Sequence, residues 1–143
     1  MEGTIGVMAI QARQETQISI FLENRAGVVS DLADSLAEHK VNIKAITVLD
    51  THDVGTMRMV VEDHDKAIKV LKEYGAAYME IPVLTIEMKN EPGGFARIAR
   101  TLADAGVNIE YVYGTATPGT ERTVAVFRVN NVDRALGLTF DQD

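Results

Sequence analysis

Two stretches of the chain decide the fold, namely ENRAGVVSDLADSLAEHKVNI at Glu23–Ile43 and KNEPGGFARIARTLADAGVNI at Lys89–Ile109. They align without a gap at an offset of 66 residues, and eight of the 21 aligned positions are identical. The identical pairs are Asn24/Asn90, Gly27/Gly93, Ala33/Ala99, Leu36/Leu102, Ala37/Ala103, Val41/Val107, Asn42/Asn108 and Ile43/Ile109. This agreement indicates an internal repeat, in which each copy is one structural unit.

The hydrophobic pattern around the first stretch has the period of a strand before the loop and the period of a helix after it. Ile18, Ile20 and Leu22 alternate with other residues, as in a half-buried strand, and 28–37 carries an apolar stripe at helical spacing. The remaining expected elements are strands at 42–49, 56–62 and 77–81, a turn at 50–55 and a helix at 65–74. The order βαββαβ predicts an α+β, ferredoxin-like unit with an antiparallel sheet and helices on one face.

The second copy repeats this pattern and then stops early. We expect strands at 83–89, 108–116 and 122–129, a helix at 94–105, a turn at 117–119 and a last helix that opens at 131–133. We therefore predict an N-terminal extension at 1–14, a first domain at 15–82 and a C-terminally truncated second domain at 83–143. The missing elements leave a sheet edge open, which residues 4–12 or a second chain would cover. A disordered extension is the alternative.

Composition narrows the class of protein. The chain has 143 residues, of which 46% are hydrophobic and 24% charged, as in globular proteins. No apolar run approaches the roughly 18 residues of a membrane helix, and the N-terminus lacks the pattern of a secretory signal. Cysteine is absent, which excludes disulfides and thiolate catalysis, and the net charge of −7 argues against a nucleic-acid partner. These features predict a cytoplasmic protein with no membrane segment.

The two loops carry a family resemblance. Asn24-Arg25-Ala26-Gly27 and Asn90-Glu91-Pro92-Gly93, each followed by a helix and then Val-Asn-Ile, resemble the loop motif of the ACT domain. That family is a βαββαβ regulatory module that binds small ligands, mostly amino acids. The resemblance covers residues 15–138 as two tandem copies, similar to small free-standing ACT proteins that resemble acetolactate synthase regulatory subunits. The first loop departs from the family in having Ala26 where proline is preferred.

The resemblance implies a ligand site where the loop of one domain meets strand backbone of a neighbouring domain. Backbone N–H groups at a helix N-terminus suit a carboxylate, and an asparagine amide offers both donors and an acceptor. The candidate ligand-binding residues are Asn24, Ala26, Gly27, Val28, Val29, Asn42 and Ile43 in the first copy, and Asn90, Pro92, Gly93, Gly94, Phe95, Asn108 and Ile109 in the second. We favour the second loop, because it keeps Pro92 and because Gly94 permits closer approach of a ligand. The alternative is that the asparagines and glycines only shape the turns.

Together these features predict a non-catalytic regulatory protein that senses an amino acid and acts in trans on an amino-acid biosynthetic enzyme. We expect a homodimer, because strand 122–129 carries apolar residues on both faces, and we expect no cofactor and no metal. His39, His52 and His64 lack the spacing of a metal site, and Tyr111 and Tyr113 are predicted to share a strand face with Ile109. Asp63 or Asp65 is predicted to cap a helix.

Three other classes of protein compete with this prediction. A structural ACT module without a ligand is the main alternative. RNA-recognition domains share the βαββαβ order, but they need aromatic residues on the central strands of one unit, and Phe21 and Phe127 fall in different copies. A small enzyme is the third, yet no pairing of nucleophile and base is legible in the sequence.

Overall fold

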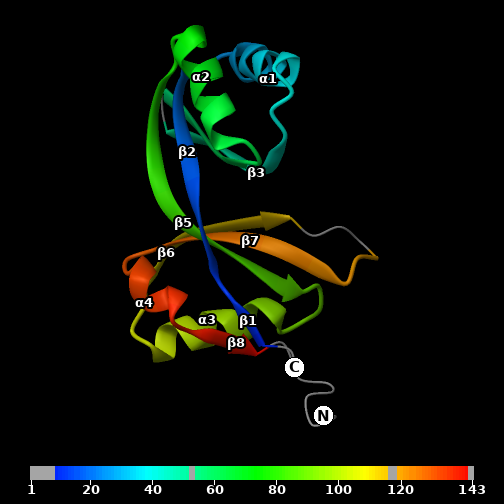
Figure 1. Cartoon of the computed structure of the whole chain (residues 1–143), viewed down its shortest axis with the longest axis vertical. Coiled ribbons are helices and arrows are strands. Elements are labelled where there is room, and N and C mark those ends of the chain that lie inside the picture. Colours follow the sequence, from blue (N-terminus) through cyan, green and yellow to red (C-terminus); the bar gives the residue numbers. More distant parts are fainter. Residues whose placement is uncertain (1–8, 52–53, 116–118, 142–143) are drawn as a thin grey trace. The chain divides into compact units, whose positions relative to one another are not determined.

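A computed structural model describes residues 9–51, 54–115 and 119–141 (Figure 1). The chain divides into two compact units. The first unit is Thr16–Ile81, and the second unit is Pro82–Asp143 together with Met1–Glu15. The described part of the N-terminal segment therefore belongs with the second unit.

The first unit has the predicted order of elements. Its strands are β2 (Arg13–Glu23), β3 (Ile43–Thr51), β4 (Val54–Val61) and the start of β5 (Ala77–Lys89), and its helices are α1 (Val28–Glu38) and α2 (His64–Tyr74). The sheet order is β3-β4-β2-β5, and β4 pairs antiparallel with both β2 and β3. Residues from β2, β4 and both helices form one buried cluster, so the two helices cover the same face of the sheet. This arrangement confirms the ferredoxin-like prediction.

The second unit repeats the arrangement with β5, β6 (Ile109–Thr115), β7 (Arg122–Val129) and α3 (Gly94–Asp104). β7 pairs antiparallel with β5 and β6, and β2 follows β5 in the sheet order. Ala125, Phe127 and Val129 lie in the buried cluster, on the same strand face as predicted. On the other face of β7, Val126 is fully buried whereas Val124 is 41% exposed.

Strand β5 runs through a proline that the sequence analysis placed at a boundary between two strands. The structure has one strand from Ala77 to Lys89, with Pro82 inside it. The carbonyl of Pro82 accepts a hydrogen bond of 2.9 Å from the guanidinium of Arg128. Proline removes only its own N–H donor from a ladder, so an extended strand continues where that donor is not needed.

The last elements of the second unit are short. Helix α4 spans Val132–Leu136, and β8 spans Thr139–Asp141. β8 pairs antiparallel with β1 (Ala9–Gln11) in a separate two-stranded sheet that lies against α3 (Figure 1). The described part of the segment at 4–12 thus pairs with β8, while β2 occupies the place beside β5. Residues 4–8 of that predicted segment lie outside the described residues.

A register shift corrects one prediction about strand faces. The pairing of β6 with β7 slips between Ile109 and Tyr111, and β3 has the equivalent shift after Ile43. Ile109 and Val112 both pack against the buried cluster. Tyr111 and Tyr113, on either side of Val112, therefore point to the opposite face, where their rings stack at 6.5 Å. The prediction that the tyrosines share a face with Ile109 is wrong, because a bulge breaks the two-residue period.

The helix ends follow the sequence signals. Asp63 caps α2, because its side chain accepts a hydrogen bond of 3.1 Å from the Lys66 N–H, and Gly75 ends the helix in the left-handed conformation. Asn131 caps α4 in the same way through the Arg134 N–H. No helix among the described residues is long and apolar enough to cross a membrane.

Candidate functional site

The loop between β2 and α1 presents an uncapped helix N-terminus. Gly27 precedes α1 with φ 92°, a left-handed conformation that favours glycine, and no side chain caps the helix. The Gly27 carbonyl accepts a hydrogen bond of 2.9 Å from the Asp31 N–H. The Val28 N–H donates to the Arg25 carbonyl at 3.4 Å. The next N–H groups of the first helical turn have no acceptor within a helix, so they can bind an anionic group.

Asn24 links this loop to the end of the edge strand β3. Its side-chain amide donates a hydrogen bond of 2.8 Å to the carboxylate of Asp50. Beside this pair lies a hollow of about 140 Å³, lined by Leu22, Glu23, Asn24, Arg25, Val29, Val48, Leu49, Asp50, Gly55, Thr56 and Met57. The hollow therefore combines a carboxylate, an amide and apolar side chains beside the helix N-terminus.

The loop between β5 and α3 has the same backbone geometry. Gly93 precedes α3 with φ 91°, again without a side-chain cap, and its carbonyl accepts a hydrogen bond of 3.0 Å from the Arg97 N–H. Asn90, however, makes different bonds from those of Asn24. Its backbone N–H donates to the Glu121 carbonyl at 2.9 Å, and its side-chain amide donates to the Thr120 carbonyl at 3.2 Å. Here the loop asparagine is tied to backbone of the β6–β7 connection.

Two hollows flank the second loop. A polar one of about 350 Å³ is lined by Lys89, Asn90, Glu91, Glu121 and Arg122. An apolar one of about 270 Å³ is lined by Met88, Phe95, Val112, Tyr113, Gly114, Thr123, Val124 and Ala125. The Thr123 hydroxyl is buried and has no hydrogen-bond partner among the described residues. It is a polar group that a ligand in the apolar hollow could bind.

The hollows occupy equivalent places in the two units. Leu22 lies opposite Gly55 across the β2–β4 ladder, and Met88 lies opposite Thr123 across the β5–β7 ladder. Val29 of α1 corresponds to Phe95 of α3, which stacks on Phe127 with ring centroids 6.1 Å apart. The repeat has therefore preserved a hollow beside each helix N-terminus.

Position 94 is a glycine for a different reason from the one that the sequence suggested. A Cβ atom at this position would lie 2.4 Å from the Lys89 carbonyl oxygen. The space that a side chain would need is thus filled by the chain's own strand rather than left open to a ligand. At Gly27 nothing lies within 4 Å of the Cβ position, so only its positive φ restricts the residue.

Each loop also carries an ion pair. In the first loop the Glu23 carboxylate accepts a hydrogen bond of 2.7 Å from Arg25, which raises the pKa of the exposed Arg25 guanidinium above its usual value. In the second loop the Arg97 guanidinium contacts the Glu91 carboxylate at 3.0 Å and is only 29% exposed. It lies 3.1 Å from the Cβ position of Gly93, so Arg97 covers the loop backbone.

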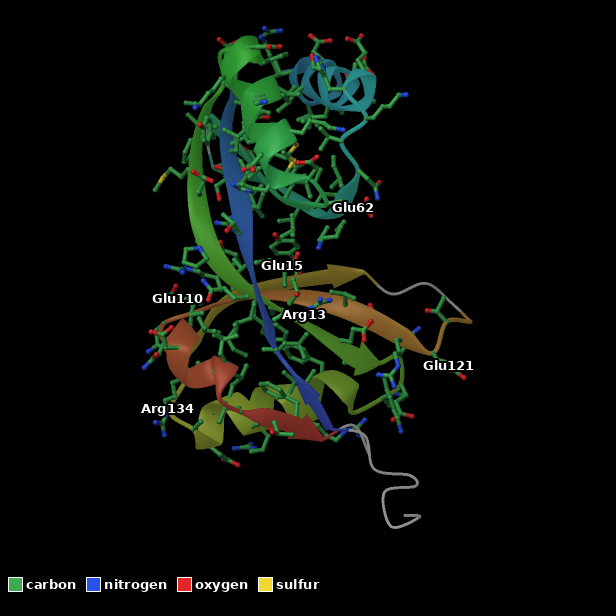
Figure 2. All side chains as sticks on the ribbon, in the orientation of Figure 1. Arg13, Glu15, Glu62, Glu110, Glu121 and Arg134 are labelled. Atoms are coloured by element: carbon green, nitrogen blue, oxygen red, sulfur yellow. The ribbon has the colours of Figure 1, made fainter. Side chains whose placement is uncertain are left out.

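The asparagines of the Val-Asn-Ile motif lie far from the loops of their own units. Asn42 pairs with Glu62 at the start of β3, and Asp50 lies eight residues further along that strand, about 26 Å away. Asn108 likewise bonds to Asn130, where β6 begins and β7 has ended. Figure 2 shows the two ends of this hairpin, with Glu110 at one and Glu121 at the other. Within a unit the structure does not bring Asn42 and Ile43, or Asn108 and Ile109, to the loop.

The structure adds residues that the sequence analysis did not select. Val48 and Asp50 in the first unit, and Val112, Gly114 and Thr123 in the second, line the hollows beside the loops. The sequence placed Asp50 in a turn, because nothing local shows that the β3–β4 hairpin brings it to Asn24. The pairing register alone carries that information.

The histidines make ordinary local contacts. The His39 ring bonds to the Ser35 carbonyl at 2.8 Å, and the His64 ring bonds to the Glu80 carboxylate. His52 lies outside the described residues. No group of three or more metal-binding side chains occurs in the described part of the chain.

Comparison with known proteins agrees with this architecture. The family model described as "ACT domain pair" matches residues 13–142. Protein BT0572 from Bacteroides thetaiotaomicron has 35% identity and a TM-score of 0.80, with 87% of this chain and 85% of that chain covered. No curated protein matches the sequence.

More distant structures share the fold. The ligand-free regulatory subunit of aspartate kinase from Thermus thermophilus has 17% identity and a TM-score of 0.65, with 91% of this chain and 93% of that chain covered. The regulatory subunit of aspartate kinase from Thermus flavus has 19% identity and a TM-score of 0.61, with 92% of each chain covered. With a repeated ferredoxin-like unit, a glycine-led helix in each copy and a family match over nearly its whole length, the chain belongs to the ACT domain family as an ACT domain pair.

Proposed function

We propose that this protein is a non-catalytic regulatory protein that binds an amino acid at interfaces between ACT units. It acts in trans, as a cytoplasmic homodimer, on an enzyme of amino-acid metabolism. The observation that carries the proposal is the uncapped helix N-terminus beside a hollow, found at equivalent places in both units.

The chemistry of the first loop suits the two ends of an amino acid. A carboxylate would accept hydrogen bonds from the first-turn N–H groups of α1, where the helix dipole also favours negative charge. An ammonium would pair with the Asp50 carboxylate, which already accepts a bond from Asn24. Charge-assisted bonds of this kind contribute about 1.5–3 kcal/mol each, so a few of them support micromolar to millimolar affinity.

The second loop offers different chemistry. Ala116 stands in the sequence where the first copy has Asp50, and Lys89 and Arg122 line the polar hollow with Glu91 and Glu121. The adjacent apolar hollow holds the buried Thr123 hydroxyl. We now prefer the first loop, because its hollow combines the Asp50 carboxylate with the helix N-terminus.

A thermal-shift screen of the full chain against the twenty amino acids at millimolar concentration tests the proposal. A ligand at 100 times its Kd adds about 2.7 kcal/mol to the unfolding free energy. Asn24→Ala should abolish the shift if the first loop binds, and Asn90→Ala is the matched control. No shift with any amino acid would contradict the proposal.

A structural role without a ligand is the second candidate, and one observation favours it. The side-chain amides of Asn24 and Asn90 both donate within the chain, as turn-forming asparagines do. This candidate predicts that both alanine variants lower the melting temperature while no amino acid changes that of the wild-type chain. The protein would then act as a regulatory subunit through protein contacts alone.

The relatives add support for a regulatory role. The Thermus proteins are named as regulatory subunits of aspartate kinase, and this chain covers nearly their whole length.

A further inference from the structure

The polar hollow of the second unit lies at the end of the β5–β7 ladder. Its volume is about 350 Å³, and it is lined by Lys89, Asn90, Glu91, Glu121 and Arg122. Lys89 and Arg122 lie directly opposite each other, one step beyond the pair of Met88 and Thr123. Met88 belongs to the buried cluster that includes residues of α3, so alternation along the strands turns Lys89 and Arg122 to the face away from the helices. The two cations therefore point away from the apolar hollow that Met88 and Thr123 line.

Two cations that face each other across a ladder repel each other. The Cβ atoms of directly opposite residues are about 4.5–5.5 Å apart, and like charges at that separation are unfavourable. Lys89 and Arg122 are both half-buried, so solvent screens their charges less than it screens charges on the open surface. A doubly charged oxyanion between them would remove the repulsion. It would accept hydrogen bonds from both side chains, of which the Arg122 guanidinium can donate two in parallel.

The carboxylates of the hollow do not outweigh these cations. The Glu91 carboxylate contacts Arg97 at 3.0 Å, so a cation outside the lining already balances its charge. Counting Arg97, three cations and two carboxylates surround the hollow, which is a local excess of positive charge in a chain of net charge −7. The rim is also fixed, because the Asn90 N–H donates to the Glu121 carbonyl at 2.9 Å. The site is thus largely formed before a ligand binds.

The matching place in the first unit has the opposite charge. Glu23, which corresponds to Lys89 in the repeat, lies opposite Val54 across the β2–β4 ladder. The first turn of α1 carries Asp31 where α3 carries Arg97. Both carboxylates would repel an anion, although the glycine-led turn is the same in the two loops. The pair of cations is therefore specific to the second unit and does not follow from the repeat.

We infer that the polar hollow binds a small anionic metabolite through a doubly charged oxyanion group held between Lys89 and Arg122. The group is a phosphate or the paired carboxylates of a dicarboxylic acid, since both match two neighbouring cations. The volume is at the lower end of the range of small-molecule sites, about 300–1,000 Å³. The inference goes beyond the proposed function, because the ligand class and the face of the sheet differ from those of an amino acid beside Asn24.

Titration of the full chain with inorganic phosphate, and separately with succinate, tests the inference. Sodium chloride at equal ionic strength is the baseline. In two-dimensional amide NMR spectra the signals of 89–91 and 120–122 should shift and saturate with a millimolar or tighter Kd, while those of α1 stay in place. Saturation with phosphate alone would identify a phosphate group, and saturation with succinate alone would identify a dicarboxylate. Saturation with both would support the shared oxyanion chemistry, and saturation with neither would overturn the inference.

Variants that remove one charge locate the site. Arg122→Gln and Lys89→Gln should each raise the anion dissociation constant at least about tenfold, because each removes a charge-assisted contact. Lys69→Gln, at an exposed position of α2, changes the net charge equally and should leave the constant unchanged. Glu121→Gln should lower the constant about threefold, because it removes a neighbouring negative charge. Circular dichroism confirms that each variant is folded. Equal weakening by Lys69→Gln and Arg122→Gln would indicate general charge attraction and would contradict the inference.

Asn24→Ala separates this site from the proposed amino-acid site. The variant should lose the thermal shift with an amino acid and keep the response to the anion, because Asn24 does not line the polar hollow. Anion binding without a thermal shift from any amino acid would support this inference and reject the proposed function. A thermal shift from an amino acid without anion binding would do the reverse.

Discussion

The two loops share a backbone and differ in what surrounds it. Gly27 and Gly93 have φ angles of 92° and 91°, and each precedes a helix that lacks a side-chain cap. The first loop is open at its glycine and faces the carboxylate of Asp50. In the second loop a Cβ atom at Gly94 would lie 2.4 Å from the Lys89 carbonyl oxygen, and Arg97 lies over Gly93. The two copies of the repeat thus share the backbone conformation of the turn, whereas the side chains beside the turn differ between the two units.

The largest expected effect tests whether the units are equivalent in their cores. Leu36 and Leu102 occupy matching helix positions and are 1% and 0% exposed. Leu36→Ala and Leu102→Ala should each lower the unfolding free energy by about 3 kcal/mol, because each leaves a cavity in a close-packed cluster. Urea denaturation followed by circular dichroism measures both, with the exposed Glu38→Ala as control. Losses of unfolding free energy that differ by more than about 2 kcal/mol between the two variants would show that the two cores are not equivalent.

The next effect separates the two loops. Gly94→Ala should cost about 2–3 kcal/mol, because its Cβ atom would collide with backbone that cannot move freely. Gly27→Ala should cost only about 1 kcal/mol, since the space is open and only the positive φ is unfavourable. Thermal unfolding compares them, and a Gly94→Ala variant as stable as wild type would show that the Lys89 carbonyl does not exclude a side chain at this position.

A smaller effect concerns the two ion pairs. Arg97→Ala should cost about 1 kcal/mol, because the half-buried guanidinium loses both Glu91 and its packing over Gly93. Arg25→Ala should leave the melting temperature unchanged, because Arg25 and Glu23 are 66% and 75% exposed. Differential scanning calorimetry at low and high salt measures both. Equal losses in the two variants would mean that burial does not distinguish the pairs.

Much of the fold could be predicted because its signals are local. The apolar stripe of α1, the capping Asp63 and the terminating Gly75 each act within a few residues, and each lies where expected. The observed strands differ from the predicted ones in two places. Strand β5 continues through Pro82, and a bulge in β6 places Tyr111 on the face opposite to Ile109. Both features depend on the neighbouring strand, which a local pattern does not show.

The candidate site could be predicted only in part. Of the predicted loop residues, Asn24, Val29, Asn90 and Phe95 line the hollows. The predicted residues between them do not, namely Ala26, Gly27, Val28, Pro92, Gly93 and Gly94. Asn42 and Asn108 do not join them within a unit, since a whole strand separates the two ends. Asp50 and Thr123 could not be predicted as site residues, because they are far from the loops along the chain and only strand pairing brings them close.

The repeat, the order of elements and the two glycine-led turns can be read from the amino-acid pattern alone, since they follow from hydrophobic period and backbone sterics. The packed fold, in contrast, sets which side chains complete each hollow and why Gly94 must be glycine. These properties depend on strand register and close packing, which couple residues far apart in the chain and leave no local trace in its pattern.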